Sequence, residues 1–111
     1  MTVELRLGGV SLGRARLAPP DPGTGTRTGP LTPTDAYELI CPIFRLFDDA
    51  EAAGAPEARA AALARATRAR AALKLTLVTE DGRALAPSLI HVHDRHAARE
   101  LLLEVHGLPA D

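Results

Sequence analysis

The sequence predicts an α+β domain in which an antiparallel sheet, built from two β-hairpins, carries helices packed on one face. Three observations lead to this fold class. Apolar residues alternate with polar ones on both sides of a two-glycine turn near the N-terminus, two segments with helical spacing follow, and a second alternating pair comes after them. A third helical segment ends the chain, so the expected order is ββααββα. The 111 residues match one domain, and we expect residues 1–111 to fold as a single unit.

Apolar and charged residues alternate along the first seven residues, and two glycines follow at positions 8–9. This pattern is typical of a tight β-hairpin. A two-residue turn sets Leu5 opposite Leu12. The alternation slips after Leu12, so we expect a β-bulge at Gly13 to absorb the extra residue.

Residues 18–31, with the sequence APPDPGTGTRTGPL, contain proline and glycine too densely for a helix or a strand. The segment predicts a loop longer than the usual connection inside a compact domain. Such loops are functional lids or mobile connections, and we expect the second.

Thr32 and Pro33 have the form of a helix start, with Asp35 at a capping-box position. Apolar residues from 36 to 50 then share one broad helical face, which predicts burial against more than one neighbour. Pro42 lies on the polar side of this helix. We therefore expect one kinked helix rather than two.

A second helix is expected from Pro56 to about residue 73, a segment composed largely of alanine and arginine. Its arginines make it locally basic, as in a nucleic-acid-binding helix; they are Arg59, Arg65, Arg68 and Arg70. Their helical angles do not form one stripe, and Asp48, Asp49 and Glu51 lie just upstream to pair with some of them. Because the net charge is also −1, we expect a solvated helix surface and no nucleic-acid partner.

The second hairpin follows this helix. Residues 73–78 alternate, and residues 79–83 have the form of a three-residue hairpin loop with glycine in the left-handed position. This loop sets Leu85 opposite Leu77, and the same register sets Leu89 opposite Leu73. Pro87 confines the returning strand to a sheet edge or breaks it.

A C-terminal helix is expected from Asp94, as N-cap, to a stop at 107–109. His106 lies at its end, where the helix dipole explains a histidine. Leu103 lies opposite the apolar stripe of this helix, among polar neighbours that include His96 and Arg99. We therefore expect these three residues, Leu103, Arg99 and His96, to form an interface with another chain.

His91, His93 and His96 form the nearest approach to a chemical motif. Residues two apart in a strand share a face, so His91 and His93 are predicted to present two imidazoles side by side, with His96 arriving from the next turn. These three could hold zinc or another divalent metal. The alternative is that they are solvent-facing residues of a half-covered sheet.

The amino-acid composition disfavours several classes of function. Aromatic residues make up 3% of the chain, which disfavours stacking sites for bases or sugars. There is one cysteine, Cys41, and no base adjacent to it, and Asp48 and Asp49 diverge on a helix, so no catalytic constellation emerges. Neither an apolar run long enough for a membrane nor a secretory signal is present, and we expect a cytoplasmic protein.

These observations predict a small, non-catalytic protein-interaction or accessory module without a cofactor, whose partner is another protein or, as a homodimer, itself. The other hypothesis is a small metal- or ligand-binding protein with its site around His91, His93 and His96.

Overall fold

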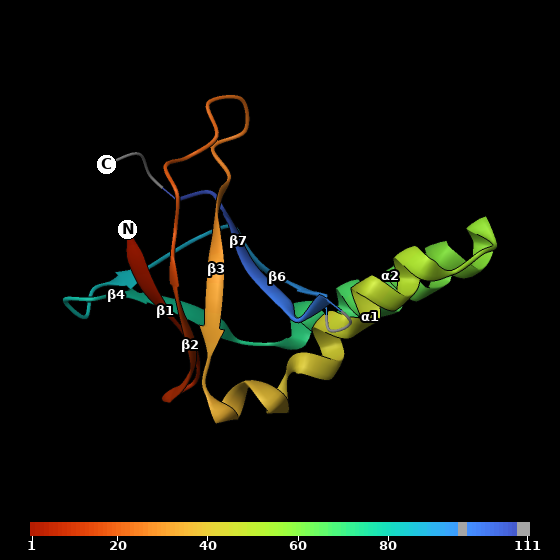
Figure 1. Cartoon of the computed structure of the whole chain (residues 1–111), viewed down its shortest axis with the longest axis horizontal. Helices are drawn as coiled ribbons and strands as arrows, with labels where there is room; N and C mark the ends of the chain where they lie inside the picture. The colour runs from red at the N-terminus through yellow and green to blue at the C-terminus, as the bar shows by residue number, and fades with distance from the viewer. Residues whose placement is uncertain (96–97, 109–111) are drawn as a thin grey trace.

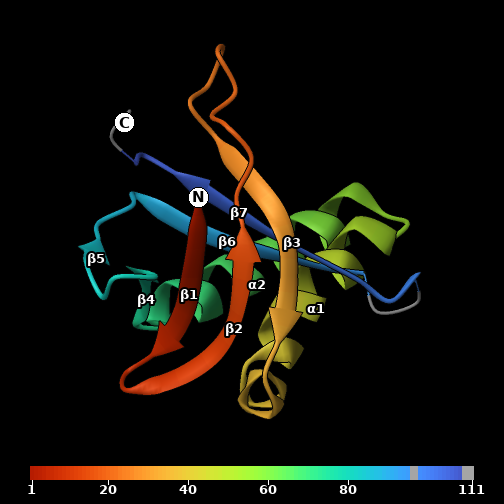
Figure 2. The same ribbon diagram turned by 60° about the vertical axis from the view of Figure 1, so that its left-hand side comes forward.

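The computed structural model describes residues 1–95 and 98–108, which form one curled antiparallel sheet and a helical hairpin (Figures 1 and 2). The strands are β1 (Thr2–Leu7), β2 (Val10–Arg16), β3 (Arg27–Pro33), β4 (Leu75–Thr79), β5 (Ala84–Leu85), β6 (Leu89–Arg95) and β7 (Glu100–His106). The helices are the 3₁₀ helix η1 (Asp35–Leu39), α1 (Cys41–Ala52) and α2 (Pro56–Ala72). The seven strands lie in the order β5-β4-β1-β2-β3-β7-β6.

The predicted α+β class with an antiparallel sheet is confirmed. The predicted ββααββα order is wrong, because the described residues contain seven strands and two α-helices. One additional strand, β3, begins in the expected loop, and another, β7, replaces the expected last helix.

The first hairpin forms with the predicted turn and a bulge. Antiparallel pairing joins β1 to β2, and its register shifts between Leu5 and Arg6. Leu5 pairs with Gly13 and not with Leu12, so Leu12 is the extra residue of the bulge. Both leucines are nevertheless fully buried.

The loop predicted for residues 18–31 is too long, because strand β3 begins inside it at Arg27. This strand lies between two others although it contains Pro30, which lacks the N–H that an interior strand donates. The strand changes partner along its length: residues 27–30 pair with β7, and residues 31–33 pair with β2. Proline is tolerated because the stretch of β3 that pairs with β7 differs from the stretch that pairs with β2.

The kinked helix predicted from Thr32 is also wrong. Strand β3 continues through its expected start, the short 3₁₀ helix follows, and α1 begins only at Cys41. Pro42 therefore lies in the first turn of α1, where a missing N–H needs no partner and causes no kink. The Thr34 hydroxyl makes no cap and instead donates to the carbonyl oxygen of Ser11 at 2.6 Å.

Helix α2 and the second hairpin turn follow the prediction. The helix begins at Pro56. In the turn, the Thr79 amide donates to the carbonyl oxygen of Arg83 at 2.9 Å. Leu77 pairs with Leu85, as expected.

The strand predicted to return from the second turn is too long. Strand β5 has two residues and ends before Pro87, and Leu89 pairs with His106 rather than with Leu73. Residues 89–95 form a strand of their own, β6, at the opposite edge of the sheet. Proline separates the two strands because it removes a ladder donor.

The predicted C-terminal helix is wrong. Residues 100–106 form strand β7, which pairs with β6 on one side and with β3 on the other. Its short apolar run fits the helical and the strand period, and the cross-strand pairing decides between them. Leu103, which was expected to be exposed, is 0% exposed and pairs with Val92.

The sheet curls around a core formed by strands from both ends of the chain, together with side chains from η1 and α1. Helix α1 packs against β6, and α2 packs chiefly against α1. The two helices form a hairpin that projects away from the sheet (Figure 1). Among the described residues, no helix has the length and apolarity required to span a membrane.

Candidate functional site

A cleft of about 160 Å³ lies between the helical hairpin and strand β6. Helix α1 supplies the rings of Phe44 and Phe47 to its wall, and β6 supplies His91 and His93. A concave, partly apolar site with a few polar groups is the usual form of a binding site.

His91 and His93 lie on one face of β6, as the strand period predicted. Their ring centroids are 4.6 Å apart in an edge-to-face arrangement. The alternative that both histidines face solvent does not hold for His91, which is 7% exposed. The rings of Phe44 and Phe47 lie 5.7 and 4.7 Å from it, because α1 covers this strand.

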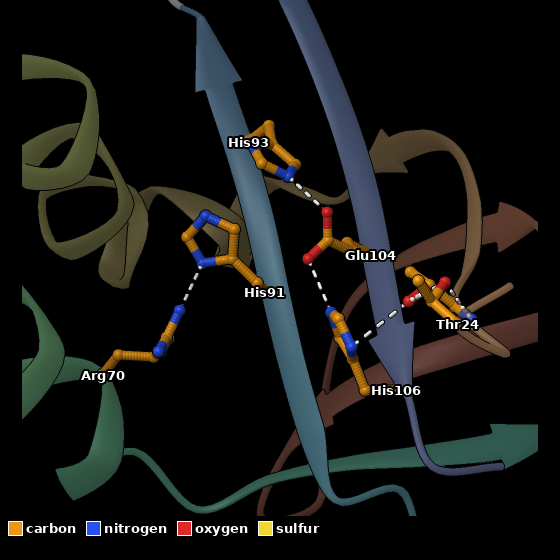
Figure 3. A network of polar contacts seen from close by, with 7 residues as sticks. Thr24, Arg70, His91, His93, Glu104 and His106 are labelled. Atoms are coloured by element: carbon orange, nitrogen blue, oxygen red, sulfur yellow. Dashed lines mark hydrogen bonds and ion pairs between the residues drawn. The ribbon is translucent and has the colours of Figure 1, made fainter. Parts of the chain in front are cut away.

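Arg70 of α2 determines the tautomer of His91. Its Nη1 atom lies 2.8 Å from His91 Nδ1 (Figure 3). Because a guanidinium only donates hydrogen bonds, Nδ1 accepts, and the neutral ring carries its hydrogen on Nε2. Burial, followed by the proximity of His93 and Arg70, lowers the pKa of His91 to about 4. His91 is therefore neutral at pH 7.

Glu104 on the neighbouring strand joins two further histidines (Figure 3). Its Oε1 atom lies 2.9 Å from His93 Nε2, and its Oε2 atom lies 2.6 Å from His106 Nε2. Burial raises the pKa of Glu104, but the hydrogen bonds from His106 and His93 outweigh it and lower this pKa overall. The carboxylate therefore accepts from both rings, and His106 Nδ1 can accept from the Thr26 hydroxyl at 3.3 Å.

The sequence prediction missed Glu104 and His106 as members of this cluster. It placed them on a helix, where their side chains would not meet His93. Strand pairing instead sets Glu104 directly opposite His91, and the period of two puts His106 on the same face. The sequence indicates that Glu104 and His106 share a face with His93 only if residues 100–106 are assigned to a strand.

Two of the three residues of the predicted metal site, His91 and His93, are among the described residues. Among residues 1–95 and 98–108, no three His, Cys, Asp or Glu side chains are grouped so that they could hold a metal ion. His91 and His93 come together, but His96 lies outside the described residues. The Nε2 atom of His93 and the Nδ1 atom of His91 are already engaged in hydrogen bonds.

The predicted interface of Leu103, Arg99 and His96 loses its basis. Leu103 is a core residue of β7, and Arg99 lies in the exposed turn before that strand with a φ of 54°. His96 lies outside the described residues. The helix that would have carried all three residues on one surface does not form.

The charged side chains of the helical hairpin are a second feature of this region. Asp48 and Glu51 of α1 and Arg59 of α2 all line the cleft. We expected the acidic residues to pair with the arginines of α2, yet no ion pair joins them within the part of the chain that the structure describes. The Arg59 side chain instead donates to the carbonyl oxygen of Ala53 at 3.1 Å, near the end of α1.

No protein-family model, no curated protein and no solved structure matches this chain.

Proposed function

We propose that this chain is a small, non-catalytic interaction module that self-associates through its α1–α2 hairpin. The observation that carries the proposal is the exposure of α2, which has 17 residues and a single buried one, Ala66. A helix of a globular domain usually buries an apolar stripe, and tertiary packing supplies most of its stability.

Helix α2 also lacks the charged side-chain pairs found in many solvated helices. Charged pairs three or four residues apart can stabilise an exposed helix. The one acidic residue of α2, Glu57, is followed at those spacings by Ala60 and Ala61. A contact with another chain would supply the packing that this helix lacks within its own fold.

Exposed apolar side chains on the same hairpin support this assignment. Leu46 of α1 is 39% exposed and Leu63 of α2 is 46% exposed. Single exposed leucines are common on monomers. Two of them on a projecting hairpin, one of which lines a partly apolar cleft, favour an interaction surface.

Native mass spectrometry and light scattering over a range of protein concentrations test the proposal. We expect a species of twice the chain mass that dissociates on dilution. A particle that remains monomeric up to millimolar concentration would contradict self-association.

We propose a ligand-binding or metal-binding role as the second candidate, favoured by the contact between His91 and His93 at the wall of the cleft. The probe is zinc, because neutral imidazole is a preferred zinc ligand. Calorimetric titration should give one zinc per chain, and the double variant His91→Ala, His93→Ala should lose it. Equal binding by the double variant would exclude this site.

A further inference from the structure

We infer that a second copy of this chain closes the cleft between the hairpin and β6. In this assembly Leu63 of each copy enters the cleft of the other, and Arg59 of each faces Asp48 and Glu51 of the other. The inference rests on the proposed self-association and specifies where it occurs.

The charges of the cleft are complementary to one another. Helix α1 contributes two carboxylates, Asp48 and Glu51, and α2 contributes the guanidinium of Arg59. Although they line one cleft, no ion pair of 4.0 Å or less joins them among the described residues. Arg95, the cationic side chain that β6 adds to the cleft, is already 3.8 Å from Glu100. Each copy thus offers two carboxylates and a guanidinium that are not paired with one another, and the Arg59 side chain donates instead to the carbonyl oxygen of Ala53.

The apolar part of the cleft matches an aliphatic side chain. Phe44 is buried and Phe47 is partly buried, and the cleft beside them measures about 160 Å³. Leu63 lines this cleft and is 46% exposed. Burial of two such leucines removes apolar surface from water in both copies at once.

Twofold symmetry explains why a second copy fits better than an unrelated chain. In a twofold dimer the same surface meets itself, so a contact between residues i and j occurs twice. A surface that carries Arg59 together with Asp48 and Glu51 satisfies this condition without any further partner. The acidic and basic groups then meet in two equivalent clusters on either side of the axis.

Charge reversal tests the pairing. Arg59→Glu alone, and Asp48→Lys with Glu51→Lys, should each raise the dimer dissociation constant about tenfold or more, because like charges then face each other. The chain that carries all three substitutions should return to within about threefold of the wild-type constant, because the pairs are restored with opposite sign. An equimolar mixture of the two reversed chains should form the heterodimer for the same reason.

Leucine substitution tests the apolar contact. Leu63→Glu should abolish the dimer. The matched control is Leu39→Glu in η1, since Leu39 is 72% exposed and lies outside the cleft. Circular dichroism of every variant establishes that it remains folded.

The outcomes separate the two levels of the proposal. A wild-type monomer at all concentrations would overturn both the self-association and this interface. A wild-type dimer that is unchanged by Leu63→Glu and by the charge reversals would keep self-association and overturn this interface. Loss of the dimer in each of the two reversed chains, without recovery in the chain that carries all three substitutions, would also overturn the Arg59 pairing.

Discussion

Asp94 shows how the role of one side chain depends on the element that holds it. On the expected helix it would have been an exposed N-cap. In strand β6 it is 4% exposed, accepts a hydrogen bond from the Tyr37 hydroxyl at 2.9 Å and lies 3.5 Å from Arg45 Nε. Burial and the neighbouring carboxylate raise the pKa of Tyr37, so its hydroxyl remains a donor at all ordinary pH values. The hydrogen bond between Tyr37 and Asp94 connects η1 to β6.

His91 makes the stability of the fold depend on pH. In the folded chain its pKa is about 4, against 6.5 for an unperturbed histidine. Between these values the unfolded chain binds more protons than the folded one, so the free energy of unfolding rises with pH. Stability is therefore lost as pH falls from about 6.5 towards 4.

Denaturant unfolding at pH 7.5 and pH 5 measures this effect. We expect the wild-type chain to lose on the order of 1–2 kcal/mol more than His91→Gln over this interval. Glutamine keeps an acceptor for Arg70 and does not titrate, which makes it the matched control. An equal loss in both proteins would show that other groups cause the pH dependence.

At the scale of elements, the position of strand β3 depends on its close approach to the end of β2. Gly29 lies against the backbone of Arg16, and an added Cβ would be 2.7 Å from the carbonyl carbon and closer still to its oxygen. A backbone carbonyl cannot turn aside as a flexible side chain can. Glycine is required here by the approach of the chain and not by an unusual φ.

Gly29→Ala should therefore lower the free energy of unfolding by about 1–3 kcal/mol, because β3 must shift to accommodate the methyl group. Gly9→Ala is the control, since its Cβ would meet no heavy atom within 4 Å, and it should change stability by about 0.5 kcal/mol or less. Chemical denaturation of the two variants gives the comparison. Similar values for both would contradict the close approach.

The secondary structure of the last element was decided by its partners. Asp94 and Gly107 have the residue types of helix caps, and Leu101, Leu102 and Val105 between them fit a helical stripe. Residues 100–106 nevertheless lie between β3 and β6, where each backbone group can join a ladder. Tertiary pairing overrides local preference in a segment this short.

At the scale of the whole molecule, one core joins the two ends of the chain. Val3 and Leu5 near the N-terminus share it with Leu103 and Val105 near the C-terminus. A defect in β7 should therefore affect the whole sheet and not only the last hairpin. Leu103 therefore belongs to the core, whereas the sequence had indicated an interface role.

Leu103→Ala should lower the free energy of unfolding by about 2–5 kcal/mol, the usual cost of a cavity at a fully buried leucine. The oligomeric state of the fraction that remains folded should be unchanged. Denaturation followed by circular dichroism, together with light scattering, gives both quantities. A variant that keeps its free energy of unfolding but loses self-association would instead place Leu103 in an interface.

The sequence by itself determined the features that depend on neighbouring residues: the turns at positions 8–9 and 79–83, the start of α2 at Pro56, and the shared face of His91 and His93. Glycine turns, proline starts and the strand period act within a few residues. The tertiary structure alone decided that residues 27–33 and 100–106 are strands, and hence that Glu104 meets His93 and that Leu103 is buried. The pairing of β3 with β7 joins segments more than 70 residues apart, as between Arg27 and Val105, and no local pattern encodes it. The contact between Glu104 and His93 follows once residues 100–106 pair with β6 as a strand.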